Sequence, residues 1–215
     1  MKKAVIFDLD GTLIDSLPDI ALNVNLTLKH FGKKPISIKK VKSFIGDGAK
    51  DLIFRAFDKS LTDSALAERL EYYNSLYSSS TSPNTKLFDG ITNLLTKLCE
   101  RGYILAVLSN KPSRTIAPIS EGILKGLNFD IIQGACERFP LKPNPQSVLS
   151  IINELGVSCE NAYLVGDGDT DVQTAINANI NGIAVLWGYR TKTQLKKAGA
   201  KVFVKSPQQL LEILS

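Results

Sequence analysis

Two short apolar segments of this chain each run directly into aspartates. Residues 4–7 (Ala-Val-Ile-Phe) lead into Asp8 and Asp10, and residues 162–165 (Ala-Tyr-Leu-Val) lead into a second acidic segment at Asp167. Short segments that are apolar throughout are typical of strands buried on both faces of a parallel sheet. Because binding groups gather at the carboxyl ends of such strands, we expect these aspartates to lie close together. Carboxylate oxygens are ligands that Mg²⁺ prefers, so the pattern predicts a hard-cation site at one edge of a sheet.

Apolar runs and amphipathic stretches alternate over most of the chain. The expected strands lie at 4–7, 104–108, about 129–132, 162–165, 183–187 and 202–204. The expected helices lie at 91–101, 114–126, 145–155, 171–178, 191–198 and 207–214. This order predicts an α/β fold in which a parallel sheet carries helices on both faces.

The alternation is interrupted between Asp15 and about Lys86 by a segment that reads as mostly helical. The helices expected in it lie at 18–31, 38–44, 48–58 and 63–77, and a polar loop follows at 78–84. We therefore expect two domains: a core made of residues 1–15 and 87–215, and an all-helical insertion made of residues 16–86.

Composition narrows the classes of protein to which the chain can belong. No apolar run approaches the ~20 residues that a membrane-spanning helix needs, and 3 cysteines without C-x-x-C spacing indicate reduced thiols. The net charge of +5 comes from scattered lysines, which are typical of solvated faces and not of a nucleic-acid interface. We therefore expect a cytoplasmic protein that binds neither membranes nor nucleic acid.

The single histidine limits the catalytic mechanisms that are available. His30 lies in a helical-looking stretch far from the strand ends, which favours a surface position at the end of a helix. The chain has no G-x-x-x-x-G-K-[ST] segment and no cysteine followed by an arginine six positions later. These features argue against a phosphohistidine enzyme, a P-loop nucleotide enzyme and a cysteine-based phosphatase.

The segment Asp8-x-Asp10-x-Thr12 has the residues for phosphoryl transfer through an aspartate. A carboxylate can attack phosphorus and form an acyl phosphate that water later hydrolyses. A second carboxylate two residues further on lies on the same side of an extended chain and can give a proton to the leaving oxygen. The alternative for this motif taken alone is a helix cap or a turn, because Asp-x-Asp-Gly is common in loops.

Two further candidates come from polar residues beside other elements. Ser109 and Asn110 follow the expected second strand, where a hydroxyl and backbone N–H groups can bind a phosphate oxygen. Lys142 stands just before a proline at an expected helix start, where its charge could neutralise a phosphate or orient the nucleophile. The alternatives are an ordinary Ser-Asn turn and a surface lysine.

Taken in chain order, these segments resemble the four motifs of the haloacid dehalogenase superfamily. The four segments are Asp8-Leu-Asp10-Gly-Thr12, Ser109-Asn110, Lys142-Pro143 and Gly166-Asp167-x-x-x-Asp171. The resemblance covers essentially the whole chain and implies a Rossmann-like core with a helical cap inserted after the first motif. An acid at position 10 points to a phosphatase or phosphomutase, because the dehalogenase branch lacks one there.

The resemblance also implies roles for individual residues. Asp8 would be the nucleophile, and Asp10 would be the general acid and later the base. Asp8, Asp167 and the Asp10 backbone carbonyl would hold Mg²⁺, with Asp171 near the metal waters or Lys142. The residues expected to hold the phosphoryl oxygens are Thr12, Ser109, Asn110 and Lys142.

The inserted segment resembles the cap of phosphoglycolate phosphatases more closely than that of other branches. The resemblance rests on residues 44–56, on residues 102–112 and on Trp187-Gly188-Tyr189. In the cap, Gly46 and Gly48 would let the backbone approach the substrate, and Arg55 could pair with a substrate carboxylate. The alternatives are a helix N-terminal turn for the glycines, and an exposed arginine or an ion pair within the cap for Arg55.

One position departs from the family pattern: Gly168 stands where the superfamily usually has Ser or Thr. A missing hydroxyl there could loosen the surroundings of the metal ligands but should not abolish metal binding.

The sequence therefore predicts a Mg²⁺-dependent phosphomonoester hydrolase that acts on a small phosphorylated metabolite, with phosphoglycolate as the first choice. Other phosphatases of the superfamily remain open, namely a pyrophosphatase, a nucleotidase or a sugar-phosphate phosphatase. A β-phosphoglucomutase-like mutase and a non-catalytic binding protein are weaker alternatives. The oligomeric state is left open between a monomer and a homodimer.

Overall fold

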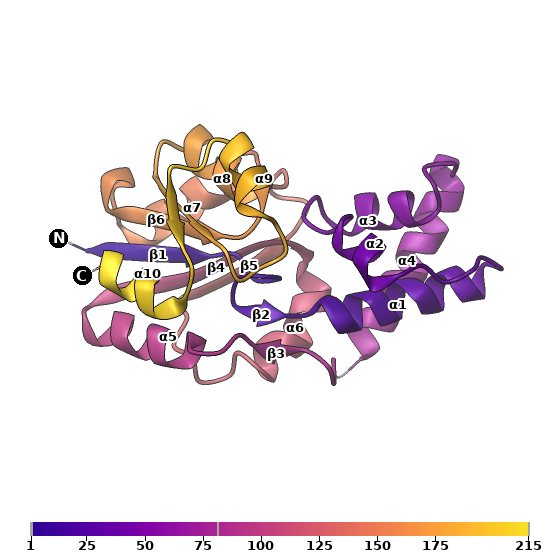
Figure 1. Cartoon of the computed structure of the whole chain (residues 1–215), viewed down its shortest axis with the longest axis horizontal. Helices are drawn as coiled ribbons and strands as arrows, with labels where there is room; N and C mark the ends of the chain where they lie inside the picture. The colour runs from indigo at the N-terminus through magenta and orange to yellow at the C-terminus, as the bar shows by residue number, and fades with distance from the viewer. Residues whose placement is uncertain (1, 81, 215) are drawn as a thin grey trace.

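The computed structural model describes residues 2–80 and 82–214, and within these residues it contains a six-stranded parallel sheet (Figure 1). The strands are β1 (Lys3–Phe7), β4 (Tyr103–Pro112), β5 (Ile131–Ala135), β6 (Ala162–Gly166), β7 (Asn181–Val185) and β8 (Val202–Val204). Their order is β5-β4-β1-β6-β7-β8, and each neighbouring pair is parallel. The predicted α/β class with a parallel sheet is confirmed.

The strands are apolar throughout because helices cover both faces of the sheet. Along β1, Val5 and Phe7 belong to the core on one face, and Ala4 and Ile6 belong to the core on the other. The first face packs against α5 (Ile91–Glu100), α6 (Ser113–Glu121) and α10 (Pro207–Ile213). The second face packs against α7 (Gln146–Leu155) and α8 (Asp169–Asn177), and α9 (Lys192–Lys197) packs beside α8 (Figure 1).

Four helices that follow β1 lie together beyond the carboxyl end of the sheet (Figure 1). They are α1 (Leu17–His30), α2 (Ile38–Lys42), α3 (Ala49–Ala56) and α4 (Asp63–Ser79). Their shared core includes Val24, Leu28, Ile53 and Phe57, and α4 also contacts α6 of the sheet region. The positions of the helices agree with the expected all-helical insertion, and its division from the core as a separate domain stays a prediction. Within the expected polar loop at 78–84, residue 81 lies outside the described residues.

A short antiparallel ribbon joins the two ends of the helical insertion. Strands β2 (Ile14–Asp15) and β3 (Lys86–Leu87) pair through two residues each, close to the two boundaries expected from the sequence. Strands this short leave no period-2 pattern, so they were not predicted. A 3₁₀-helix, η1 (Cys159–Asn161), was also not predicted.

Several expected element bounds differ from those observed. The strand expected near 129–132 lies at Ile131–Ala135, and the one expected at 183–187 lies at Asn181–Val185. The helix expected at 114–126 ends at Glu121, because the next residue, Gly122, has φ −103° and ψ −94° and so lies outside the helical region. His30 is exposed at the end of α1, as predicted. None of the helices in the described residues is long and apolar enough to span a membrane.

The difference in burial between two leucines predicts that the same substitution, Leu to Ala, has very different effects on the free energy of unfolding at the two positions. Leu105 on β4 is fully buried, and Leu26 on α1 is 41% exposed. Leu105→Ala should lower the free energy of unfolding by about 2–5 kcal/mol, because it removes buried methyl groups and leaves a cavity. Leu26→Ala should change it by about 0.5 kcal/mol or less. Urea denaturation followed by circular dichroism checks both, and equal losses would contradict the assigned core.

Candidate active site

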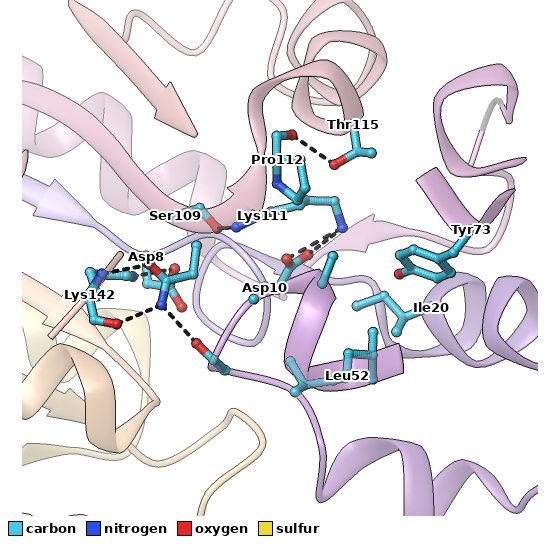
Figure 2. A pocket seen from close by; sticks show the side chains of 15 residues that line it. Asp8, Asp10, Ile20, Leu52, Tyr73, Ser109, Lys111, Pro112, Thr115 and Lys142 are labelled. Carbon is cyan, nitrogen blue, oxygen red and sulfur yellow. Dashed lines mark hydrogen bonds and ion pairs between the residues drawn. The ribbon is translucent and has the colours of Figure 1, made fainter. Parts of the chain in front are cut away.

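The polar residues singled out in the sequence meet at the carboxyl ends of β1, β4 and β6. Some of them line a cavity of about 60 Å³ (Figure 2), whereas Thr12, Asp167 and Asp171 lie outside its lining. The sheet region lines this cavity with Asp8, Asp10, Ser109, Asn110, Lys111 and Lys142. The helical insertion lines it with Ile20, Gly46, Gly48, Leu52 and Tyr73. The cavity therefore has a charged wall from the sheet and a mainly apolar wall from the helices.

Three carboxylates form an acidic cluster beside this cavity. Oxygen atoms of Asp8, Asp167 and Asp171 lie within 4.8 Å of one another. Asp167 is held in place by Thr12, whose hydroxyl donates to Oδ1 at 3.0 Å, and by the backbone N–H of Tyr189, which donates to Oδ2 at 2.6 Å. Such a set of oxygen donors is suited to a divalent cation.

Two glycines allow the chain to approach these aspartates closely. A Cβ atom on Gly188 would lie 2.3 Å from Cβ of Asp167, and one on Gly166 would lie 2.2 Å from Cγ of Asp171. Either distance is far below van der Waals contact, so no larger residue fits without moving a carboxylate. Gly188 was quoted in the sequence only as part of a resemblance, and its contact with Asp167 gives it a structural reason.

Lys142 is buried at the centre of the cluster. Its ammonium donates to Asp8 Oδ1 at 2.8 Å, to Asp171 Oδ1 at 2.6 Å and to the carbonyl of Leu108 at 2.9 Å. A lysine ammonium has three N–H donors, so these contacts use all of them. Asn110 fixes the backbone, because its amide accepts from Lys142 N–H at 2.8 Å and donates to Lys142 C=O at 3.0 Å. The alternative of a surface lysine does not describe this residue.

Charge and burial shift the pKa values of this cluster. Burial, together with the charge of Asp171, raises the pKa of Asp8 to about 8 despite the nearby ammonium. Burial and the charge of Asp171 also raise the pKa of Asp167 to about 7. For Lys142 burial lowers the pKa, but the charges of Asp171 and Asp8 raise it by more, so the group stays an ammonium. With all groups ionised, three carboxylates and one ammonium leave a net charge of −2.

Asp10 lies next to the cluster and has different partners. Its Oδ1 accepts from the hydroxyl of Ser16 at 2.5 Å, and the Lys111 ammonium lies 3.2 Å from Oδ1 and 3.4 Å from Oδ2. Lys111 is buried, and the ring of Tyr77 lies 4.0 Å from its ammonium. Burial lowers the pKa of Lys111, but the charge of Asp10 and the phenols of Tyr77 and Tyr73 raise it by more.

Lys111 was given no role in the sequence analysis. The signal that could have found it is its position directly after Ser109 and Asn110, at the carboxyl end of a strand. Ser109 is itself buried, and its hydroxyl accepts from the Lys111 backbone N–H at 3.2 Å. Gly168, the departure from the family pattern, donates its N–H to Asp171 Oδ2 at 2.9 Å.

The three residues predicted in the cap lie in two different places. Gly46 and Gly48 line the cavity, and both have positive φ angles, 126° and 89°, that favour glycine. Arg55 lies outside the cavity lining, and its guanidinium lies 2.5 Å from Asp47 and donates to the carbonyl of Phe44 at 3.1 Å. This geometry matches the alternative of an ion pair within the helical insertion.

Comparisons with known proteins agree with this geometry. The family model for haloacid dehalogenase-like hydrolases matches residues 5–185. "Phosphoglycolate phosphatase 1" of Pseudomonas aeruginosa is 31% identical over 98% of this chain and 79% of its own length. "Phosphoglycolate phosphatase" of Colwellia psychrerythraea is 32% identical over 92% of this chain and 90% of its own length.

Solved structures show the same fold. A crystal structure from Lactobacillus delbrueckii subsp. bulgaricus aligns with a TM-score of 0.93 at 30% identity, covering 100% of this chain and 99% of that one. The resemblance noted in the sequence is therefore confirmed over nearly the whole chain. By its family model, its relatives and its fold, the chain belongs to the haloacid dehalogenase-like hydrolases.

Proposed function

We propose that this enzyme is a Mg²⁺-dependent phosphomonoester hydrolase that acts through an aspartyl phosphate on Asp8, with 2-phosphoglycolate as its substrate. The observation that carries the proposal is the buried cluster of Asp8, Asp167 and Asp171 around a single ammonium, with Asp10 two residues beyond Asp8. The phosphatase names of the curated relatives support the same chemistry.

The residues present fit a divalent cation. When all groups are ionised, the net charge of −2 lies in a largely buried cluster, and a buried charge that is not neutralised is costly. Asp8, Asp167 and the backbone carbonyl of Asp10 would hold Mg²⁺, a small number of protein ligands that is typical for this ion. When bound, Mg²⁺ would neutralise charge on the phosphoryl oxygens.

The side chains can perform the two halves of the reaction. In the first half, an Asp8 oxygen forms a bond to phosphorus, the bond from phosphorus to the substrate oxygen breaks, and Asp10 gives its proton to that leaving oxygen. In the second half, Asp10 takes a proton from water, the water oxygen attacks phosphorus, and the bond to Asp8 breaks to release phosphate. Lys142, together with Thr12, Ser109 and Asn110, would orient the phosphoryl group.

The size of the cavity supports a small substrate. The cavity is small, at about 60 Å³, and the helical insertion walls it with Ile20, Leu52 and Tyr73. Such a walled space favours a small phosphate ester over a nucleotide or a hexose phosphate. The names of the curated relatives agree with 2-phosphoglycolate.

Phosphate release from a substrate panel tests the proposal. With Mg²⁺ present, kcat/KM for 2-phosphoglycolate should exceed that for pyrophosphate, nucleotides and sugar phosphates, and EDTA should remove turnover. A preference for another panel member would contradict the substrate but leave the aspartate chemistry standing. Absence of hydrolysis from the whole panel would contradict the enzymatic activity itself.

Substitution of the proposed catalytic acids should separate chemistry from folding. Asp8→Asn should abolish turnover, because an amide is not a nucleophile, and Asp10→Asn should lose about 10²–10⁴-fold in kcat. Asp169→Asn is the matched control, because Asp169 lies two residues after Asp167, at the start of α8, but its side chain is 53% exposed. Steady-state kinetics measures the turnover of the three variants, and circular dichroism spectra show whether each of them is folded. Substantial turnover by a folded Asp8→Asn protein would contradict the mechanism through an aspartyl phosphate on Asp8.

The raised pKa values predict how stability depends on pH and on metal. Without metal, the pKa values of Asp8 and Asp167 in the folded state, about 8 and about 7, lie above the ordinary value of 3.8. The folded protein therefore binds more protons than the unfolded chain between about pH 4 and pH 8, and these groups make the free energy of unfolding fall as pH rises through that window. Mg²⁺ binds the ionised carboxylates, so it should raise the free energy of unfolding most near pH 8, the upper end of this pH window.

Urea denaturation at pH 5 and pH 8, in EDTA and in Mg²⁺, measures this dependence. Asp8→Asn removes one titrating group, so in EDTA its stability should fall less than that of the wild type between the two pH values. The prediction fails if the wild type loses no more stability than the variant.

A further inference from the structure

We propose that Lys111 binds a carboxylate of the substrate and so selects phosphate esters that carry one. The proposal rests on the proposed function, because it assigns the second anionic group of 2-phosphoglycolate to a residue. No feature of the four sequence motifs assigns a partner to that group, and the cation first considered for it, Arg55, lies outside the cavity lining.

The first observation is the difference in hydrogen bonding between the two buried lysines of the site. The Lys142 ammonium has three separate acceptors at 2.6–2.9 Å. Among the described residues, the Lys111 ammonium bonds to one carboxylate, that of Asp10, at 3.2 and 3.4 Å, and it also faces the ring of Tyr77 at 4.0 Å. Each ammonium has three N–H donors, and those of Lys142 all meet oxygen acceptors at short distances. The Lys111 ammonium has longer contacts to one carboxylate and an aromatic ring, so a carboxylate oxygen of the substrate could replace the weaker contact with the ring.

The second observation is where this ammonium lies. Lys111 lines the same cavity as Asp8, and Figure 2 shows its amine turned toward Asp10 while Lys142 lies on the other side of Asp8. The cavity therefore has one cation at each of its two neighbouring aspartates. A substrate whose phosphoryl group reaches Asp8 would have its other end close to Lys111.

The third observation is the apolar surrounding of Lys111. Its side chain is 7% exposed, and the cavity wall opposite the sheet is made by Ile20, Leu52 and Tyr73 of the helical insertion. A charge in such surroundings is poorly solvated and interacts more strongly with an opposite charge than it would at the surface. An anionic group entering the cavity would therefore bind here more tightly than a neutral one.

The chemistry favours a carboxylate over a second phosphate. One ammonium, already shared with Asp10, balances a single negative charge better than a dianion.

The test compares two substrates of similar size, one with a carboxylate and one without. For the wild type in Mg²⁺, kcat/KM for 2-phosphoglycolate should exceed that for ethyl phosphate. For Lys111→Met, that ratio should fall by about 30-fold or more, because a buried charged hydrogen bond to the substrate is lost. Lys111→Arg keeps a cation at this position, so its preference for 2-phosphoglycolate over ethyl phosphate should lie between those of the wild type and Lys111→Met. A loss of activity equal on both substrates would overturn the proposal, because it would show that Lys111 acts only by positioning Asp10.

Two controls complete the experiment. Arg55→Met removes a cation of the helical insertion outside the cavity lining and should leave the substrate ratio unchanged; a fall equal to that of Lys111→Met would also overturn the proposal. If Lys111→Met does not fold, as judged by circular dichroism, Lys111→Gln replaces it and should lower the ratio for the same reason. A wild type that shows no preference for 2-phosphoglycolate would instead overturn the proposed substrate, and that outcome is visible before any variant is made.

Discussion

The site depends on the burial of three carboxylates around one ammonium. Asp8, Asp167 and Asp171 come from two different strand ends, and their repulsion is only partly offset by Lys142. The raised pKa values of Asp8 and Asp167 express this cost directly. Such a cluster stays in place only because the surrounding backbone is rigid, and the parallel sheet supplies that rigidity by pairing β1 with both β4 and β6. The same constraint makes the cluster a strong site for a cation, since binding removes the repulsion that the fold maintains.

The helical insertion is tied to this cluster by a few polar contacts. Asn110, which fixes the backbone of Lys142, also donates to the carbonyl of Gly46 at 3.0 Å. The side chain of Arg190 donates to the carbonyls of Lys42 and Ile45. Asn110 therefore holds both the backbone of Lys142 and the wall that faces it.

Much of the fold and of the acidic cluster could be predicted from the sequence. Strands that are apolar throughout require a covered parallel sheet, and Asp8 and Asp167 follow such strands, so topology alone brings them together. The support for Asp167 was harder to predict, because Tyr189 lies 22 residues further along the chain and reaches it through a loop. The β2–β3 ribbon was missed because two residues carry no periodic signal.

The same reasoning explains why the sequence analysis considered Arg55 for a substrate carboxylate and gave Lys111 no role. In the sequence, Arg55 lies on an expected helix of the insertion and Lys111 lies at the end of a strand, and both have a charge that could meet a carboxylate. Which one reaches the cavity is decided by packing between segments that are distant in the chain. Arg55 finds Asp47 eight residues away, whereas Lys111 is enclosed by Tyr77 from α4 and by Asp10 from the end of β1. Local neighbours fix the first side chain, and only the assembled fold fixes the second. Substrate selectivity in this enzyme would then depend on the sheet as much as on the helices, because the residue that we assign to the substrate carboxylate directly follows Ser109 and Asn110, the segment proposed to orient the phosphoryl group.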